Sequence, residues 1–477
     1  MSDKTYVWAV DPTASQFVGA LLVLLLVCYW SWPVSRRKGM PPGPASLPII
    51  GNAYQLKPVN VYAQFRSLNE KYGPLASLKI GSSNMIVIGG DGTLVRELLD
   101  KRGAIYSNRP QELVNDIAGR GDHLLFQRDT NKWRTPRKLI VQHYSSRVSK
   151  DEHVRLQEAE SVQLLYDFLH QPTQFMEHVM RYLPDFMMMN WKSQAKKVGE
   201  LMDKVYGDLV EIGRQRGISG LNTNTLAHKL RMGEDSNGLT RRQQAYTCGI
   251  VLEGGSDIVS IGSDLYGYIS MIKDIACQNR ARDEIDSIYD EETLPKWEDE
   301  QQMPFVRAYH SGQGSLTLAP TYSRRCPTPT RAGQVTIITR DTIFQKIQQL
   351  FAMPGQSTPI QTDSTTQAEP SKRDHFAFGA GRRICPGIQI AEQDMFLAFS
   401  RLLWAFEFSA PPGTCVNTDQ SAFFGETVRR PKIFPVVITP RSERRVATVE
   451  REVETAKQNV FSLYGSYKYD KLPGFDV

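Results

Sequence analysis

The pattern of apolar and polar positions changes along the chain beyond residue 50. Residues 76–80 and 84–88 are short alternating or apolar runs separated by the turn residues 81–83, which predicts a β-hairpin. Further along, apolar residues recur at helical spacing with polar positions between them, and this predicts helices at 93–102, 151–169, 193–216 and 388–408. Because helix dominates and no internal repeat is visible, we expect a mainly α fold with a small β-rich subdomain, an α+β class.

The N-terminal segment is uncharged and apolar over residues 17–32, and 14–34 extends it to a length that can span a bilayer. Arg36, Arg37 and Lys38 follow the run, whereas a cleavable signal peptide carries its positive charge before the run. The positive-inside rule then keeps the basic side in the cytosol. We expect a lumenal N-terminus at 1–16, a transmembrane signal anchor at 17–34 and a basic, proline-rich hinge at 35–48; the alternative is a buried core helix.

Composition limits the class of protein without naming it. The chain has 477 residues with 41% hydrophobic and 23% charged residues, which is ordinary for a globular protein. The net charge of +6 is mild, and no dense Lys/Arg tract interleaved with aromatic residues indicates nucleic acid. The six cysteines show no paired spacing such as C-x-x-C, so neither a zinc finger nor a disulfide framework is indicated.

The strongest chemical signal is the segment 378–387, FGAGRRICPG. It places Cys385 at the end of a glycine-rich loop and at the start of the predicted helix from residue 388. The positive end of a helix and the nearby Arg382 and Arg383 are expected to favour thiolate over thiol. A single thiolate is a poor zinc site but a good axial ligand for haem iron. The alternative is a buried structural cysteine in a glycine-rich turn.

This loop resembles the haem-binding loop of the cytochrome P-450 family. The matching positions are Phe378, Gly381, Arg383, Cys385 and Gly387, and the preceding residues 373–378 look like fungal microsomal members. The resemblance implies the cytochrome P-450 fold, haem b as cofactor, Cys385 as the axial ligand of its iron, and the other four positions as haem-binding residues.

A second basic segment is expected to contact the haem. Trp133 and Arg137 are four residues apart, on one face if the segment is helical. The resemblance implies that these two residues and Arg383 bind a haem propionate, a task that suits the planar guanidinium of arginine. The alternative is a basic, solvated helix end. The resemblance further suggests that an acidic reductase docks on the outer face, at Lys132, Arg134 and Lys138.

Residues 252–260, LEGGSDIVS, resemble the middle of the long helix that crosses the haem in this family. Gly254 and Gly255 would make room for dioxygen, and Asp257 would take part in proton delivery. The family pattern then has Thr, whereas this chain has Ile258. A hydrocarbon side chain cannot donate a hydrogen bond or position a water molecule, so the usual proton relay is incomplete.

Two stretches depart from the family pattern. The Glu-x-x-Arg motif expected before the haem loop is absent from 310–372, whose Ser/Thr/Gln/Pro-rich composition resembles disordered or non-native sequence. The distance from Trp133 to Gly254 is also shorter than the family shows, with the join near 182–184. Both departures suggest a mis-spliced or degraded gene product; the alternative is an evolved variant that dispenses with the Glu-x-x-Arg motif. We expect a catalytic domain at 49–440, atypical at 310–372, and a charged tail at 441–477 that forms a solvated helix.

The resemblance implies a haem-dependent monooxygenase that inserts one oxygen of dioxygen into an apolar small molecule, in fungal secondary-metabolite biosynthesis. Electrons would come from NADPH through a separate NADPH-cytochrome reductase, with the enzyme held in the endoplasmic reticulum membrane by one span and its catalytic domain in the cytosol. Two alternatives stay open: a catalytically impaired or non-catalytic haem-binding remnant, and a haem-thiolate dehydratase or isomerase, which needs no proton relay to oxygen.

Overall fold

The structure is a computed structural model of the whole chain. It describes residues 12–31, 39–47, 50–57, 61–81, 83–89, 93–109, 113–128, 130–145, 153–174, 191–220, 224–232, 238–258, 272, 275–307, 333–339, 351–353, 378–414, 423–424, 430–432 and 434–462.

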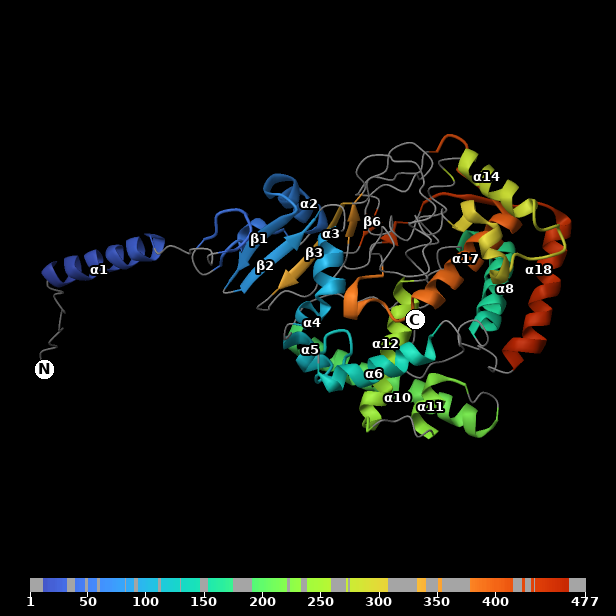
Figure 1. Cartoon of the computed structure of the whole chain (residues 1–477), viewed down its shortest axis with the longest axis horizontal. Helices are drawn as coiled ribbons and strands as arrows, with labels where there is room; N and C mark the ends of the chain where they lie inside the picture. The colour runs from blue at the N-terminus through green and yellow to red at the C-terminus, as the bar shows by residue number, and fades with distance from the viewer. Residues whose placement is uncertain are drawn as a thin grey trace, which may run out of the picture.

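Helices dominate the described structure, and the strands gather in small sheets (Figure 1), which confirms the predicted fold class. The predicted helices at 151–169 and 193–216 are confirmed as α8 and α10, and the one at 93–102 divides into α3 and η2. The α-helices of the described residues are α1 (Pro12–Ser31), α2 (Val61–Tyr72), α3 (Thr93–Val95), α4 (Gly103–Tyr106), α5 (Leu113–Ala118), α6 (Asn131–His143), α8 (Val154–His170), α10 (Trp191–Ile218), α11 (Leu226–Met232), α12 (Arg241–Ile258), α14 (Ile275–Asp286), α17 (Ile388–Ala405) and α18 (Glu443–Ala456). The other helical turns are η1 (Ala53–Gln55), η2 (Arg96–Lys101), η4 (Pro172–Gln174), η7 (Trp297–Gln302), η9 (Gly381–Arg383) and η11 (Lys457–Phe461).

The predicted hairpin is confirmed as β1 (Leu75–Ile80) paired antiparallel with β2 (Ser83–Ile88). Two further antiparallel strands, β3 (Gly333–Thr339) and β4 (Phe351–Met353), complete a sheet of order β1-β2-β3-β4. Both lie within 310–372, the stretch whose composition resembles disordered or non-native sequence. Two smaller pairs join β5 (Phe406–Ser409) to β8 (Val437–Pro440) and β6 (Phe423–Phe424) to β7 (Arg430–Pro431).

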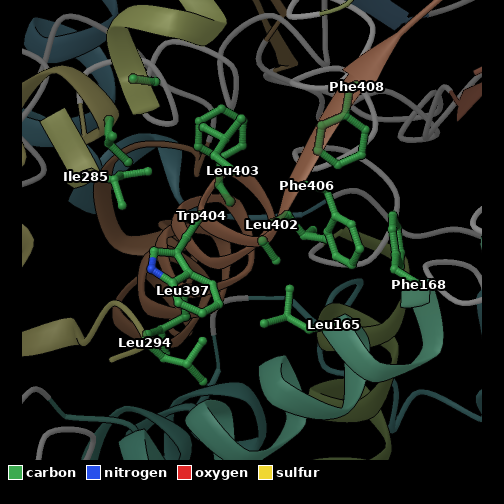
Figure 2. Close-up of a cluster of buried hydrophobic side chains, with 14 of the residues drawn as sticks. Leu165, Phe168, Ile285, Leu294, Leu397, Leu402, Leu403, Trp404, Phe406 and Phe408 are labelled. Atoms are coloured by element: carbon green, nitrogen blue, oxygen red, sulfur yellow. The ribbon is translucent and has the colours of Figure 1, made fainter. Parts of the chain in front are cut away.

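The main hydrophobic core surrounds α17, the helix that follows the Cys385 loop (Figure 2). The predicted helix at 388–408 ends at Ala405, because Phe406 begins strand β5. Burying one large apolar side chain stabilises a fold by about 1.5–3 kcal/mol, so this cluster anchors the helix behind the cysteine. Its most deeply buried residues include Leu165, Phe168, Ile285, Leu397, Leu402, Leu403, Trp404, Phe406 and Phe408.

A buried arginine fixes α17 against its neighbours. The Arg401 side chain is 3% exposed, and its Nε donates to the Pro295 carbonyl oxygen at 2.8 Å. Its Nη1 donates to the Glu158 carbonyl at 2.6 Å and to the Ser161 hydroxyl at 2.7 Å, both on α8. Burial lowers the pKa of Arg401 to about 10, with the Glu158 charge acting in the opposite direction, so the guanidinium stays protonated at neutral pH.

The C-terminal tail departs from its prediction. The expected helix is present as α18, but Val449 and Val453 are buried in the main core, so one face is not solvated. Among the described cysteines Cys248 and Cys385 are free, whereas Cys277 is disulfide-bonded, which the cysteine spacing did not indicate.

The N-terminal helix α1 extends away from the rest of the described chain (Figure 1). Its described apolar side chains are exposed, from 80% at Phe17 to 55% at Leu26. A search of the described residues finds no helix with the length and apolarity needed to cross a membrane. The expected N-terminus at 1–16 lies mostly outside the described residues, as do 32–34 at the end of the predicted anchor and the basic part of the hinge at 35–38.

Candidate functional site

The segment 378–387, called here the Cys385 loop, contains η9 and ends directly before α17. The Cys385 backbone N–H donates to the Phe378 carbonyl oxygen at 2.8 Å, which closes the loop on itself. Gly387 is the N-cap residue of α17, and a Cβ built on it would lie 3.9 Å from Cys385 Sγ, an ordinary contact distance. Cys385 therefore lies just before the N-terminus of α17, as the sequence predicted.

Gly381 holds the middle of the loop against η2. Its φ of 65° lies in the left-handed region that favours glycine, and a Cβ built there would overlap the Leu99 carbonyl group. Its N–H donates to Asp100 Oδ1 at 2.6 Å. Burial raises the pKa of Asp100, and the Gly381 hydrogen bond opposes that shift by favouring the carboxylate. The positive φ and the close contact with Leu99 therefore explain why glycine is present at position 381, one of the positions that match the family's haem-binding loop.

Arg383 and Arg137 converge on Trp133. The Arg383 guanidinium carbon lies 3.7 Å from the centroid of the Trp133 ring, and that of Arg137 lies 5.5 Å from it. Arg137 Nη2 also donates to the carbonyl oxygen of Ile384, the residue before the cysteine. Trp133 is 5% exposed. The fold thus brings together all three residues that were expected at a haem propionate.

Arg383 further ties the loop to the segment between α4 and α6. Its Nε donates to the Ser107 carbonyl at 2.8 Å, and its Nη2 donates to the Gln127 carbonyl at 2.7 Å. Neither Ser107 nor Gln127 carries a sequence signal that could have indicated this contact. Arg382 differs from its neighbour in being exposed.

The thiol of Cys385 is partly buried and free. Burial raises its pKa, and the Gly387 backbone N–H and the Arg137 charge offset this only in part. The expectation that the loop favours thiolate is therefore wrong for the protein by itself, because the cost of burying a charge exceeds the local stabilisation. Arg137, which the sequence did not indicate for this task, supplies a charge that lowers this pKa.

The glycine-containing segment of α12 is open on one side. Gly254 is exposed, and a Cβ built on it meets nothing within 4 Å. Gly255, Asp257 and Ile258 lie on the helical backbone of α12, but their surroundings and side chains fall outside the description. The side chain of the neighbouring Glu253 places its Oε2 3.0 Å from His123 Nε2. Sequence reasoning missed this pair, because its members are 130 positions apart.

Two kinds of comparison agree on the family. The Cytochrome P-450 family model matches residues 41–165, 148–310 and 348–435, with a break inside the 310–372 stretch. Cytochrome P-450 monooxygenase patH of Aspergillus clavatus is 29% identical, over 95% of this chain and 99% of that protein. Cytochrome P-450 monooxygenase yanC of Aspergillus niger is also 29% identical, with the same two coverages. The patH alignment spans 528 positions, more than the 477 residues of this chain, so it contains gaps in this chain.

Solved structures agree on the fold. A zebra fish cytochrome P-450 solved with progesterone superposes with a TM-score of 0.58 at 19% identity, covering 80% of this chain and 99% of the zebra fish chain. A second zebra fish cytochrome P-450, solved with abiraterone, gives a TM-score of 0.57, also at 19% identity.

Proposed function

Because the chain belongs to the cytochrome P-450 family, we propose that it is a haem-thiolate monooxygenase of fungal secondary metabolism. It inserts one oxygen atom of dioxygen into an apolar small molecule, and two electrons come from NADPH through a separate NADPH-cytochrome reductase. The monooxygenase names of the fungal relatives support this activity over the dehydratase and isomerase alternative.

The observation that carries the proposal is the convergence of Arg137, Arg383 and Trp133 beside a free cysteine. This donor set fits haem: a sulfur ligand for iron and the guanidinium group of Arg383 lie on the Cys385 loop, and a second guanidinium group, that of Arg137, lies on α6. Cys385 would ligate the iron, and Arg137 and Arg383, stacked on Trp133, would hold a propionate. Phe378, Gly381 and Gly387 would shape the loop around the sulfur.

The protein and the cofactor divide the chemistry. Haem supplies the oxygen-activating chemistry when bound, and the chain supplies the ligand, the pocket and the protons. The positive charge of Arg137 favours the thiolate form of Cys385, and that form is the iron ligand. Gly254 leaves space beside α12, and the family resemblance would give Gly255 the same role and Asp257 the task of delivering a proton. Ile258 cannot extend this proton path as a threonine hydroxyl would.

We further propose that residues 17–34 anchor the enzyme in the endoplasmic reticulum membrane with the catalytic domain in the cytosol. The exposed apolar side chains of α1 support an apolar environment for this segment, and the basic residues after it support the orientation. The reductase would dock on α6, where Lys132, Arg134 and Lys138 are exposed. These cations would attract an acidic partner.

The experiment uses the full-length protein produced with haem precursor and incorporated into vesicles. Its carbon monoxide difference spectrum, taken after reduction, is expected to show the Soret band of a thiolate-ligated haem. Addition of NADPH and reductase to a panel of apolar compounds is expected to give oxygenated products with one labelled oxygen from ¹⁸O-labelled dioxygen. A missing thiolate band contradicts the haem-enzyme function, and substrate conversion without NADPH indicates the dehydratase or isomerase instead.

A further inference from the structure

A buried histidine and a glutamate join two elements that are far apart in sequence. His123 lies in the segment between α5 and α6 and is 7% exposed, and its Nε2 lies 3.0 Å from Glu253 Oε2 on α12. The Glu253 side chain is 37% exposed. The aromatic ring of Phe126 lies 4.9 Å from the imidazole, centroid to centroid. The histidine is thus enclosed while its partner stays accessible.

The segment that carries His123 is fixed along α12 by a second set of contacts. Arg242 Nη1 donates to the Gly119 carbonyl at 2.9 Å and forms an ion pair with Asp122. Lys132 of α6 pairs with the same Asp122 at 2.7 Å. Arg242 and Glu253 are eleven residues apart, which is about three helical turns, so they share one face of α12. The imidazole therefore has a set position against the helix.

The partner of His123 decides which ring nitrogen carries the proton. An ionised carboxylate can only accept hydrogen bonds, so a neutral imidazole must place its hydrogen on Nε2 and leave Nδ1 as an acceptor. Within the described part of the chain, Nδ1 is buried and has no hydrogen-bond partner. Buried polar atoms in native structures are nearly always hydrogen-bonded, which makes this acceptor an indication of a ligand group.

The sequence neighbours of the pair are apolar and accessible. Leu125 is 50% exposed and Leu252 is 45% exposed, and Gly254 borders open space. Small-molecule sites are mostly apolar with a few placed polar groups that fix the orientation of the ligand. The His123–Glu253 pair has this character, because one hydrogen-bonding atom is held in place near accessible apolar surface.

We propose that Nδ1 of His123 accepts a hydrogen bond from a hydroxyl group of the substrate, with Glu253 holding the imidazole in the accepting tautomer. The substrate is then an apolar alcohol or phenol. This inference rests on the proposed monooxygenase function and adds the substrate class to it. His123 contacts the substrate, whereas Glu253 is a positioning residue that acts through His123.

The test compares 2-naphthol with 2-methoxynaphthalene, in which a methyl group replaces the hydroxyl hydrogen and removes the donor. Each is titrated into the haem-loaded full-length protein, and its dissociation constant is measured from the change in the Soret band. One hydrogen bond corresponds to about tenfold in affinity, so the wild-type protein is expected to bind 2-naphthol about tenfold more tightly than its ether. The His123→Phe variant, which keeps an aromatic ring but has no acceptor, is expected to lower this preference to about twofold or less.

Glu253→Gln tests the tautomer separately. Its amide can donate to Nε2, which allows Nδ1 to carry the hydrogen and to donate instead. The preference for the hydroxyl compound is therefore expected to shrink or reverse, although the side chain keeps its size. His143→Phe is the matched control, because His143 is another buried histidine whose Nδ1 lacks a hydrogen-bond partner among the described residues, and it lies at the far end of α6. That variant is expected to keep the wild-type preference.

The outcomes separate this inference from the proposed function. A thiolate Soret band in the reduced carbon monoxide complex establishes the haem enzyme first, in the wild type and in each variant. If the band is present but the wild type binds the ether as tightly as the naphthol, or His123→Phe and Glu253→Gln both keep the preference, the inference is overturned. Absence of the band in the wild type contradicts the proposed function instead.

Discussion

The Cys385 loop and the α12 segment around Gly254 are both rich in glycine, but Gly381 in the loop is closely packed, whereas Gly254 on α12 borders open space. In the loop, Gly381 has a positive φ and packs against the backbone of Leu99. On α12, Gly254 has ordinary helical geometry and open space where a side chain would be. The first glycine allows close packing, and the second leaves room.

This difference matches two different tasks. The loop has to present one sulfur at a fixed place, and its contacts to Asp100, Ser107 and Gln127 are made through hydrogen bonds that do not depend on any ligand. In the proposed function the α12 segment accepts molecules of a given shape, so accessible surface is useful there. The proposed function therefore depends on close packing at Gly381 and on open space at Gly254.

The largest effect is expected from removing the sulfur of the loop. Cys385→Ser is expected to abolish the thiolate Soret band and all oxygenation, because an alcohol does not replace the thiolate as iron ligand. Cys248→Ala is the control: the thiol of Cys248 is also free, but burial raises its pKa to about 12 and keeps it a neutral thiol. Reduced carbon monoxide spectra of the two variants check this, and a thiolate band that survives in Cys385→Ser contradicts the ligand assignment.

Gly381→Ala is expected to have the next largest effect. The new Cβ has to enter the space of the Leu99 carbonyl and adopt a left-handed backbone conformation, which together cost about 2–4 kcal/mol. Urea unfolding of the haem-loaded protein measures the loss, and haem release is expected to accelerate in parallel. A variant as stable as the wild type would show that the loop relaxes away from η2 freely.

Arg383→Ala tests the other contacts of the loop. It removes hydrogen bonds to two carbonyl groups and the stacking on Trp133, and the expected loss of stability is about 2–3 kcal/mol. Arg382→Ala is the matched control, because Arg382 is exposed and surface substitutions usually change stability by less than about 0.5 kcal/mol. Equal losses in the two variants would contradict the specific role of Arg383.

The sequence predicts the parts of this fold that depend on neighbours along the chain. The hairpin follows from alternation around a Gly-Ser-Ser turn, and α8 and α10 follow from helical spacing. The strands β3 and β4 were not predicted, because β3 pairs with β2, some 250 residues earlier in the chain, and β4 pairs in turn with β3. The buried face of α18 was missed for a related reason: Val449 and Val453 become core only when α8 and α17 are in place.

The residues of the candidate site also fall into those that the local sequence predicts and those that it does not. Trp133 and Arg137 were predicted together from their four-residue spacing, and the structure places both beside the loop. The pKa of Cys385 could not be judged from sequence, because it depends on how deeply the fold buries the sulfur. The contact between His123 and Glu253 could not be predicted either, since no local pattern relates two residues that meet only through packing of the α5–α6 segment on α12.

Ile258→Thr addresses the α12 side by a change in chemistry rather than in packing. A hydroxyl at this position can donate a hydrogen bond and position water, so the variant is expected to convert a several-fold larger share of the NADPH consumed into oxygenated product. The measurement is product formed per NADPH oxidised, with hydrogen peroxide as the competing product. Ile258→Val, which keeps a hydrocarbon side chain, is the control and is expected to leave this ratio unchanged. An unchanged ratio in the threonine variant would mean that protons reach the site by another path.

The smallest effect is expected at Gly254, and it tests the opening comparison directly. An alanine Cβ meets nothing within 4 Å there, and alanine favours the helix over glycine, so Gly254→Ala is expected to stabilise the protein by about 0.5–1 kcal/mol. The same methyl group reduces the open space beside Glu253, so 2-naphthol is expected to bind a few-fold more weakly than to the wild type. Urea unfolding and Soret titration measure the two quantities on one sample. Stabilisation together with weaker binding would distinguish Gly254 from Gly381, where the same substitution destabilises the protein. A loss of stability in Gly254→Ala would show instead that this surface is packed in solution and that both glycines allow close packing.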